Sequence, residues 1–176
     1  ILRYALALQT EPLQPEESER ISQIMPSIRN AVQAAKNMKD VRGDLELFRG
    51  SVKDRFHSYS YQFREAAREF YEALDSLIKA DLPALRFEAL VEIKDMAESI
   101  HRRMRHRIYD EVSRGELSEV EISTLLNANR EMLIANQSLI SALADALLNR
   151  ESVSDFASIP AARLRVVGDN PNGTRE

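Results

Sequence analysis

The stretch Ser123-Thr-Leu-Leu-Asn-Ala-Asn-Arg-Glu-Met-Leu-Ile-Ala-Asn-Gln137 decides the fold of this chain. It lies within a heptad stripe of apolar residues, which predicts one buried face on a long helix. The stripe consists of Ile122, Leu126, Leu133, Ile140, Leu143 and Leu147. Two positions on it, Asn129 and Asn136, are amides one heptad apart. Because a buried amide costs free energy unless it is hydrogen-bonded, we expect a polar layer inside a helical bundle.

This polar layer has two interpretations. In the first, the amides fix the register of helix packing; in the second, they form part of a site. We expect Asn129 and Asn136 to hydrogen-bond to side chains on the first or third long helix, with Asp44 close by. The neighbouring polar residues of the same stretch belong to the same candidate layer: Asn127, Arg130 and Glu131.

Outward from this stretch, apolar residues recur at spacings of three and four and predict three more long helices, over about 16–49, 52–80 and 83–114. On the first of them the predicted buried stripe is Ile21, Ile24, Ile28, Val32, Ala35, Met38, Val41, Leu45 and Phe48. Turn and capping residues mark the breaks, at Gly50–Ser51, Asp81–Pro83 and Gly115–Ser118. Ser118 and Glu121 have the spacing of a capping box, which opens the fourth helix to about residue 149.

Short connections between long helices indicate antiparallel neighbours. The sequence therefore predicts an all-α fold, an antiparallel bundle of four long helices with a short N-terminal helix within residues 1–9. We expect one domain over 1–150. After Arg150 the periodicity decays, which predicts a polar, mobile tail over 151–176.

Composition narrows the classes of function. The chain has 176 residues, no Cys and a net charge of −4. The lack of Cys excludes disulfides and thiolate metal sites, and the negative charge argues against nucleic acid as a partner. No segment has the ~18 consecutive apolar residues of a membrane span. The first residue is Ile, so we expect a piece of a longer protein whose missing part lies in a membrane.

Three groups of charged residues could form a metal-binding or anion-binding site. Asp40 and Asp44 are spaced i,i+4 and could hold a hard cation together with Glu131, although Lys36 can neutralise Asp40 instead and a solvated face explains the pair more simply. Glu98 and His101 match half of a di-iron motif, but no second Glu-x-x-His exists. A basic run could meet phosphate or anionic lipid, or simply flank the core: Arg102, Arg103, Arg105 and Arg107.

Several segments resemble a known family. Ala34-Ala-Lys-Asn-Met-Lys-Asp-Val-Arg-Gly-Asp-Leu45 and Leu125-Leu-Asn-Ala-Asn-Arg-Glu131, with Asn136, resemble the PhoU-like helical region at the C-terminus of bacterial sodium/phosphate cotransporter proteins. Phe70-Tyr-Glu-Ala-Leu74 and Lys79-Ala-Asp81 are similar to PhoU repeats. The resemblance covers about residues 1–149. PhoU proteins can carry metal clusters on paired acidic motifs, which Asp40 and Asp44 match and Asn127 and Glu131 match in part.

The resemblance implies a regulatory or interaction domain of a sodium-dependent phosphate transporter, on the cytoplasmic side of the inner membrane and without catalysis. Its partner would be the transmembrane region upstream in the same polypeptide, and a homo-oligomer is compatible with this interpretation. No cofactor is expected, with a metal ion as the open alternative. Two other functions stay open: a metal-binding carboxylate bundle, and a generic signalling scaffold.

Overall fold

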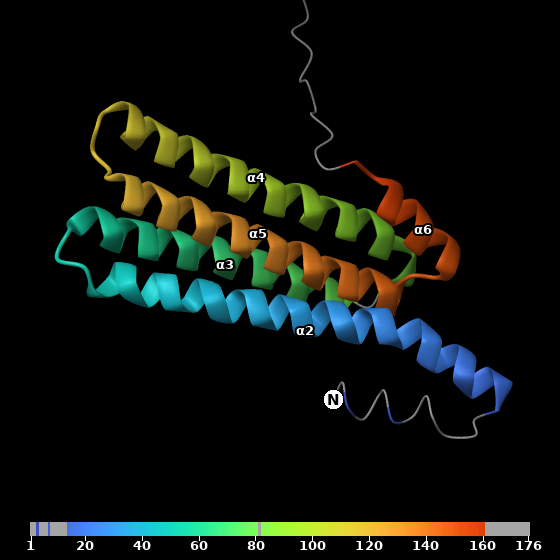
Figure 1. Ribbon diagram of the computed structural model, residues 1–176. Coiled ribbons are helices and arrows are strands. Elements are labelled where there is room, and N and C mark those ends of the chain that lie inside the picture. The colour runs from blue at the N-terminus through green and yellow to red at the C-terminus, as the bar shows by residue number, and fades with distance from the viewer. Residues whose placement is uncertain (1–2, 4–6, 8–13, 81, 161–176) are drawn as a thin grey trace, which may run out of the picture.

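The computed structural model describes residues 3, 7, 14–80 and 82–160 of the chain. Four long helices make up most of this part: α2 (Pro15–Gly50), α3 (Asp54–Ala80), α4 (Arg86–Ser113) and α5 (Glu119–Leu147). A 3₁₀ turn, η1 (Pro83–Leu85), precedes α4, and a short helix, α6 (Arg150–Ser158), follows α5. The described residues contain no strand, so the all-α prediction is confirmed. Successive long helices run in opposite directions (Figure 1).

The turns between the helices follow from local chemistry. Gly115 has φ +68°, a conformation that a residue without Cβ adopts readily, and it ends α4. The predicted capping box at the start of α5 is confirmed: the Ser118 amide donates to Glu121 Oε2 at 2.8 Å, and the Glu121 amide donates to Ser118 Oγ at 3.4 Å. Gly50 instead stays within α2, and Ser51 is its C-terminal cap.

Helix α5 is the centre of the fold, with α2 and α4 packed on either side (Figure 1). Ala128, Ala135 and Ala142 recur every seven residues along α5 and are all buried. Small side chains let a neighbouring backbone approach closely, and the Ser27 hydroxyl of α2 donates to the Ala142 carbonyl at 2.8 Å. The buried face of α5 is therefore broader than the predicted stripe, several of whose members are only half-buried.

Two apolar clusters fill the interior. The first lies toward the α2–α3 and α4–α5 turns, and includes Phe48, Tyr59, Phe63, Ile108 and Leu125. The second lies toward α6, and includes Phe70, Leu90, Ile93, Ile140 and Phe156. Asn136 comes between Met132 of the first cluster and Ile140 of the second, so a polar residue on α5 separates the two halves of the core.

Two predictions need correction. The tail predicted from residue 151 is wrong for its first part, because α6 is helical and its Phe156 is buried in the second cluster. Phe156 is the only buried residue of this nine-residue helix, so there is little periodicity to detect. Residues 161–176, and most of the short N-terminal helix predicted within 1–9, lie outside the described residues.

The predicted buried stripe of α2 is also wrong in part. Ile24 and Val32 are 51% and 46% exposed, and Ala35 is exposed as well, whereas Met25, Ala34 and Asn37 are buried instead. The face of α2 that meets α5 is rotated from the face with the most regular apolar spacing. An apolar stripe on α2 is consequently left uncovered by the described chain.

Candidate functional site

The polar layer is partly as predicted. Asn129 and Asn136 are both buried, at 3% and 2% exposure, which confirms the expected burial. Asn129 Nδ2 donates to the backbone carbonyl of His101 on α4 at 3.1 Å, and His101 Nδ1 lies 3.4 Å from the Asn129 carbonyl oxygen. The contact therefore joins α5 to the third long helix, but through a backbone carbonyl rather than the expected side chain.

Asn136 differs from Asn129. Its buried Oδ1 atom has no hydrogen-bond partner within the described residues, so the hydrogen bond predicted for this oxygen is absent. An unsatisfied buried polar atom costs on the order of 1–3 kcal/mol. The unsatisfied Asn136 oxygen at the midpoint of the core therefore lowers the stability of the fold.

Two further polar residues are buried in this region: Asn37, which the sequence interpretation did not single out, and Glu98, which it considered only as half of a di-iron motif. Asn37 of α2 is buried, and its Oδ1 accepts from Gln33 Nε2 at 2.6 Å. The bond from Asn30 to Asp145 sets the antiparallel register of α2 and α5, which places Asn37 level with Asn136. Glu98 of α4 is also buried; Arg102 lies 3.7 Å from its Oε2, while its Oε1 has no partner in the described part.

The other members of the predicted layer lie at the surface. Arg130 donates to Asn127 Oδ1 at 3.2 Å and to Glu131 Oε1 at 3.0 Å. Asp44 lines the same open pocket as Asn127 and Arg130, together with Ser123. Asp44 of α2 and Asn127 and Arg130 of α5 thus lie on either side of the interface between these helices. Arg130 and Asp44 are exposed or half-buried, so they do not extend the buried layer.

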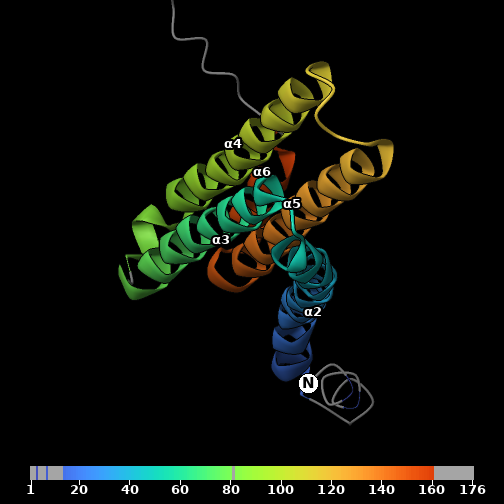
Figure 2. The ribbon, with the colours of Figure 1, turned by 90° about the vertical axis from the view of Figure 1, so that its left-hand side faces the viewer.

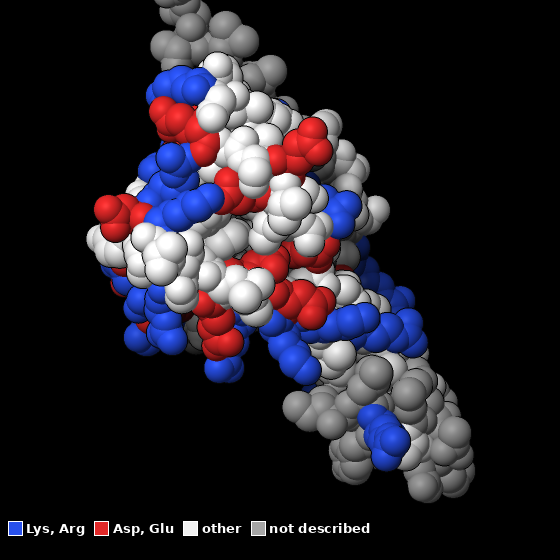
Figure 3. Space-filling model, turned by 60° about the vertical axis from the view of Figure 1, so that its left-hand side comes forward, with Lys and Arg blue, Asp and Glu red and all other residues white. Residues whose placement is uncertain are grey.

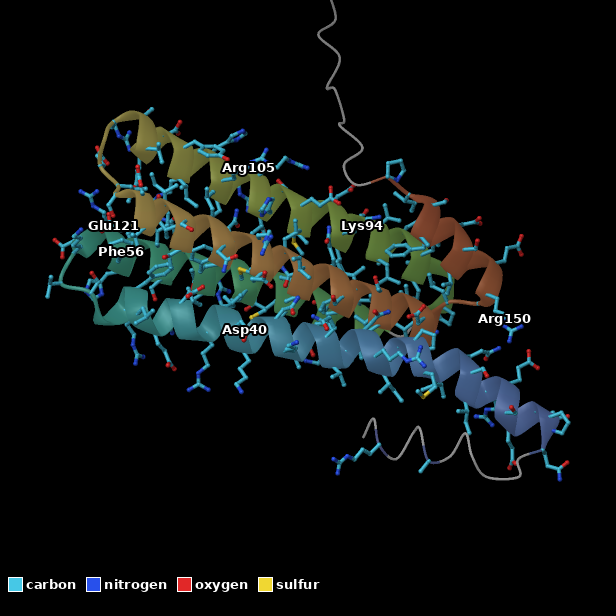
Figure 4. All side chains as sticks on the ribbon, in the orientation of Figure 1. Asp40, Phe56, Lys94, Arg105, Glu121 and Arg150 are labelled. Carbon is cyan, nitrogen blue, oxygen red and sulfur yellow. The ribbon has the colours of Figure 1, made fainter. Side chains whose placement is uncertain are left out.

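The candidate metal ligands do not assemble into a site. Among the described residues, no group of three or more His, Asp or Glu side chains is arranged to hold a metal ion, so Asp40, Asp44 and Glu131 do not form the proposed set. Asp40 projects from α2 at the surface (Figure 4). Burial raises the pKa of Asp44, and the neighbouring Asp40 charge raises it further.

Three of the four arginines in the basic run on α4 form ion pairs. Arg102 lies 3.7 Å from Glu98, Arg103 lies 3.6 Å from Glu69 on α3, and Arg107 lies 3.2 Å from Glu111. Arg105 points away from the bundle (Figure 4) and has no ion-pair partner within the described ranges. Figure 3 shows basic and acidic groups side by side on the face it presents, rather than a field of one sign.

An open apolar groove includes Ala35, one of the exposed apolar residues of α2. Helices α2 and α3 diverge from their common turn (Figure 2), and Leu139 of α5 is at the groove between them. Ala31, Ala35 and Met38 contribute from α2, and the half-exposed Tyr71 contributes from α3. Lys39 and Arg42 also line the groove, so its rim is basic. We call these residues the α2–α3 groove.

Comparison of the chain with known protein families, with curated proteins and with solved structures gives no match. Within the described residues, no helix is both long enough and apolar enough to cross a membrane. The fold and the site thus define an all-helical assembly with a polar layer in its core and an apolar groove on its surface.

Proposed function

We propose that this chain is a regulatory or interaction domain of a sodium-dependent phosphate transporter, and that it acts without catalysis of its own. The partner is the transmembrane part of the same polypeptide, upstream of Ile1, and the domain lies on the cytoplasmic side of the inner membrane. The resemblance of the Ala34–Leu45 and Leu125–Glu131 segments to PhoU-like regions supplies the transporter context.

The α2–α3 groove is the observation that supports an interaction role. An amphipathic helix that follows a regular apolar spacing gains its stability by covering that face. In the groove, Ala35 of α2 stays exposed and Met38 is only half-buried, and Tyr71 of α3 is 42% exposed. Contiguous exposed apolar surface with a polar rim is typical of protein contact sites. The groove is therefore suited to a segment of the transporter that the described residues do not contain.

The test places a charge in the groove of the full-length protein. Ala31→Glu and Ala35→Glu put a carboxylate at exposed positions that line the groove, where an apolar partner would have to desolvate it, which is costly. Sodium-dependent uptake of labelled phosphate is measured in membrane vesicles, with the amount of protein and its melting temperature measured in parallel. Both variants are expected to change uptake, or its response to external phosphate, without loss of folding.

Val52→Glu is the matched control. Val52 is 97% exposed in the α2–α3 turn and lies outside the groove, so its replacement introduces the same charge without touching the proposed contact. Uptake that is equal in the wild type, the groove variants and the control would exclude the groove as the regulatory contact. A full-length protein that takes up no phosphate in a sodium gradient would overturn the transporter assignment itself.

A further inference from the structure

A second hollow lies on the opposite side of α5, where α6 folds back toward α4 and α2. This α6 cleft has a volume of about 530 Å³. Its apolar wall includes Ile140 of α5 and Phe156 of α6, and its polar lining includes Lys94 of α4 and Asp145 of α5. Figure 4 shows Lys94 on α4 beside α6. None of these four residues was singled out for chemistry from the sequence.

Lys94 and Asp145 carry opposite charges, yet they do not pair. Within the described residues neither side chain takes part in an ion pair, although both are half-buried and face the same cleft. Lys94 Nζ donates to the Ile159 carbonyl at 2.8 Å and lies 5.4 Å from the centre of the Phe156 ring. An ammonium group has three donors, so two remain for a ligand.

Asp145 is held in place but not neutralised. Its Oδ2 accepts from Asn30 Nδ2 at 3.0 Å, which fixes the carboxylate against α2, and its Oδ1 makes no hydrogen bond within the described residues. Gln137 and Ser141 precede Asp145 at successive steps of four residues, so the three side chains line one face of α5. The side chains of Gln137 and Ser141 make no hydrogen bond within the described part of the chain, and both line the cleft.

We propose that the α6 cleft binds a small zwitterion whose ammonium and carboxylate groups are joined by a short hydrocarbon chain. The ligand carboxylate pairs with Lys94 and accepts from Gln137 or Ser141, and the ligand ammonium pairs with Asp145. Each step of four residues along α5 rises about 6 Å, so Gln137 and Asp145 are separated by about 12 Å along the axis. The hydrocarbon chain then lies against Ile140 and Phe156.

Ligands with a single charge fit this arrangement less well. A free anion such as inorganic phosphate meets Lys94 but also the Asp145 carboxylate, which repels it. A monovalent cation is attracted by Asp145 but repelled by the Lys94 ammonium group. A zwitterion with separated charges satisfies both groups and covers the apolar wall, whereas an α-amino acid is too short to reach from Gln137 to Asp145.

The test measures binding to the whole 176-residue chain by calorimetry. The probe is 6-aminohexanoate, compared with hexanoate and hexylamine, which keep the chain length but remove one charge each, and with glycine, which keeps both charges but removes the separation. We expect 6-aminohexanoate to bind at least about tenfold more tightly than each comparison compound, because each charged contact that is lost weakens binding by roughly this factor or more.

Variants assign the binding to the cleft. Lys94→Gln retains a donor for the Ile159 carbonyl, and Asp145→Asn retains an acceptor for Asn30, so both variants should fold with an unchanged melting profile. Each should weaken 6-aminohexanoate binding at least about tenfold. Lys79→Gln and Asp155→Asn are exposed controls outside the cleft and should bind as the wild type does.

Three outcomes would overturn the proposal: hexanoate or hexylamine binding as tightly as 6-aminohexanoate, no saturable binding of any probe, or binding that survives both cleft substitutions. None of these outcomes depends on the transporter assignment. The cleft test uses the isolated chain, whereas the groove test uses phosphate uptake by the full-length protein. The failure of either test therefore does not affect the other proposal.

Discussion

Asn129 Nδ2 donates to the His101 carbonyl at 3.1 Å and so connects α5 to α4 in the middle of the bundle. Seven residues further along α5, the buried Oδ1 of Asn136 has no partner among the described residues. The two amides occupy equivalent heptad positions and are equally buried. They nevertheless have opposite effects, since one contributes a cross-helix bond and the other leaves a polar atom unsatisfied.

Single replacements should separate these effects. Asn136→Leu removes an unsatisfied buried oxygen and is expected to raise the free energy of unfolding by about 1–2 kcal/mol. Asn129→Leu removes a bond and is expected to lower it by about 1 kcal/mol. The double variant should still fold. Urea denaturation followed by circular dichroism measures all three variants. An equal gain from both single variants would show that the His101 contact contributes no stability.

The contact between Lys53 and Glu121 predicts a dependence on pH. Lys53 Nζ lies 2.5 Å from Glu121 Oε1, and this hydrogen bond, with the backbone bond from Ser118, lowers the pKa of Glu121 to about 2. In the unfolded chain the pKa returns to about 4.5. The stabilisation is therefore fully present above about pH 4.5 and is lost as the pH falls toward 2.

Because Lys53 is more than half exposed, solvent screening limits this contribution to about 1 kcal/mol or less. Glu121→Gln should lower the stability at pH 7 by that amount and make less difference with each step toward pH 2. Glu119→Gln, an exposed position in the same helical turn, serves as the control. A constant difference between Glu121→Gln and the wild type from pH 7 to pH 2 would contradict the prediction. Chemical denaturation at each pH gives the comparison.

Features encoded by neighbouring residues could be predicted from the sequence, and features that depend on distant contacts could not. The Ser118–Glu121 capping box and the Gly115 turn need only their own segment. The covered face of α2 depends on how closely the alanines of α5 allow it to approach, so Ile24 and Val32 were wrongly expected in the core. The partner of Asn129 is a backbone carbonyl, which no side-chain pattern reveals.

The candidate site shows the same division. Lys94 and Asp145 line the same cleft because the chain turns back after α5 and places Phe156 against α4. One signal was available: Gln137, Ser141 and Asp145 form a polar line at intervals of four on a helix that is otherwise mostly apolar. Its meaning depends on α6, which the sequence interpretation assigned to a tail.

Two glycines provide a matched pair for backbone effects. Gly115 has φ +68°, so Gly115→Ala is expected to lower the free energy of unfolding by about 1 kcal/mol, although no atom lies within 4 Å of the added Cβ. Gly43 lies in the interior of α2 with equally open surroundings, so Gly43→Ala is expected to raise it by about 0.5–1 kcal/mol. Thermal melts of both variants test the signs. A destabilising Gly43→Ala would contradict the open, helical surroundings from which the gain is expected.

Tyr59 predicts a second effect of pH, at the alkaline end. It is 0% exposed, and its hydroxyl has no hydrogen-bond partner within the described residues. Burial, followed by the nearby Glu111 charge, raises its pKa to about 12, compared with about 10 in an exposed position. The neutral phenol is therefore favoured in the folded state. Below about pH 10 the phenol is neutral in both the folded and the unfolded state, so this group gives stability no dependence on pH. As the pH rises from 10 through 12, ionisation favours the unfolded chain and the folded state loses stability.

Tyr59→Phe tests whether this hydroxyl contributes to stability. The variant keeps the ring, whose centre lies 4.8 Å from the Arg107 guanidinium carbon, and removes only the unsatisfied oxygen. We expect stability at pH 7 to be unchanged or to rise by up to about 1 kcal/mol. In an absorbance titration at the tyrosinate band, the variant should lose the component that ionises at the raised pKa of Tyr59, about 12. A loss of more than about 1 kcal/mol in Tyr59→Phe would contradict the absence of a hydrogen bond to this hydroxyl.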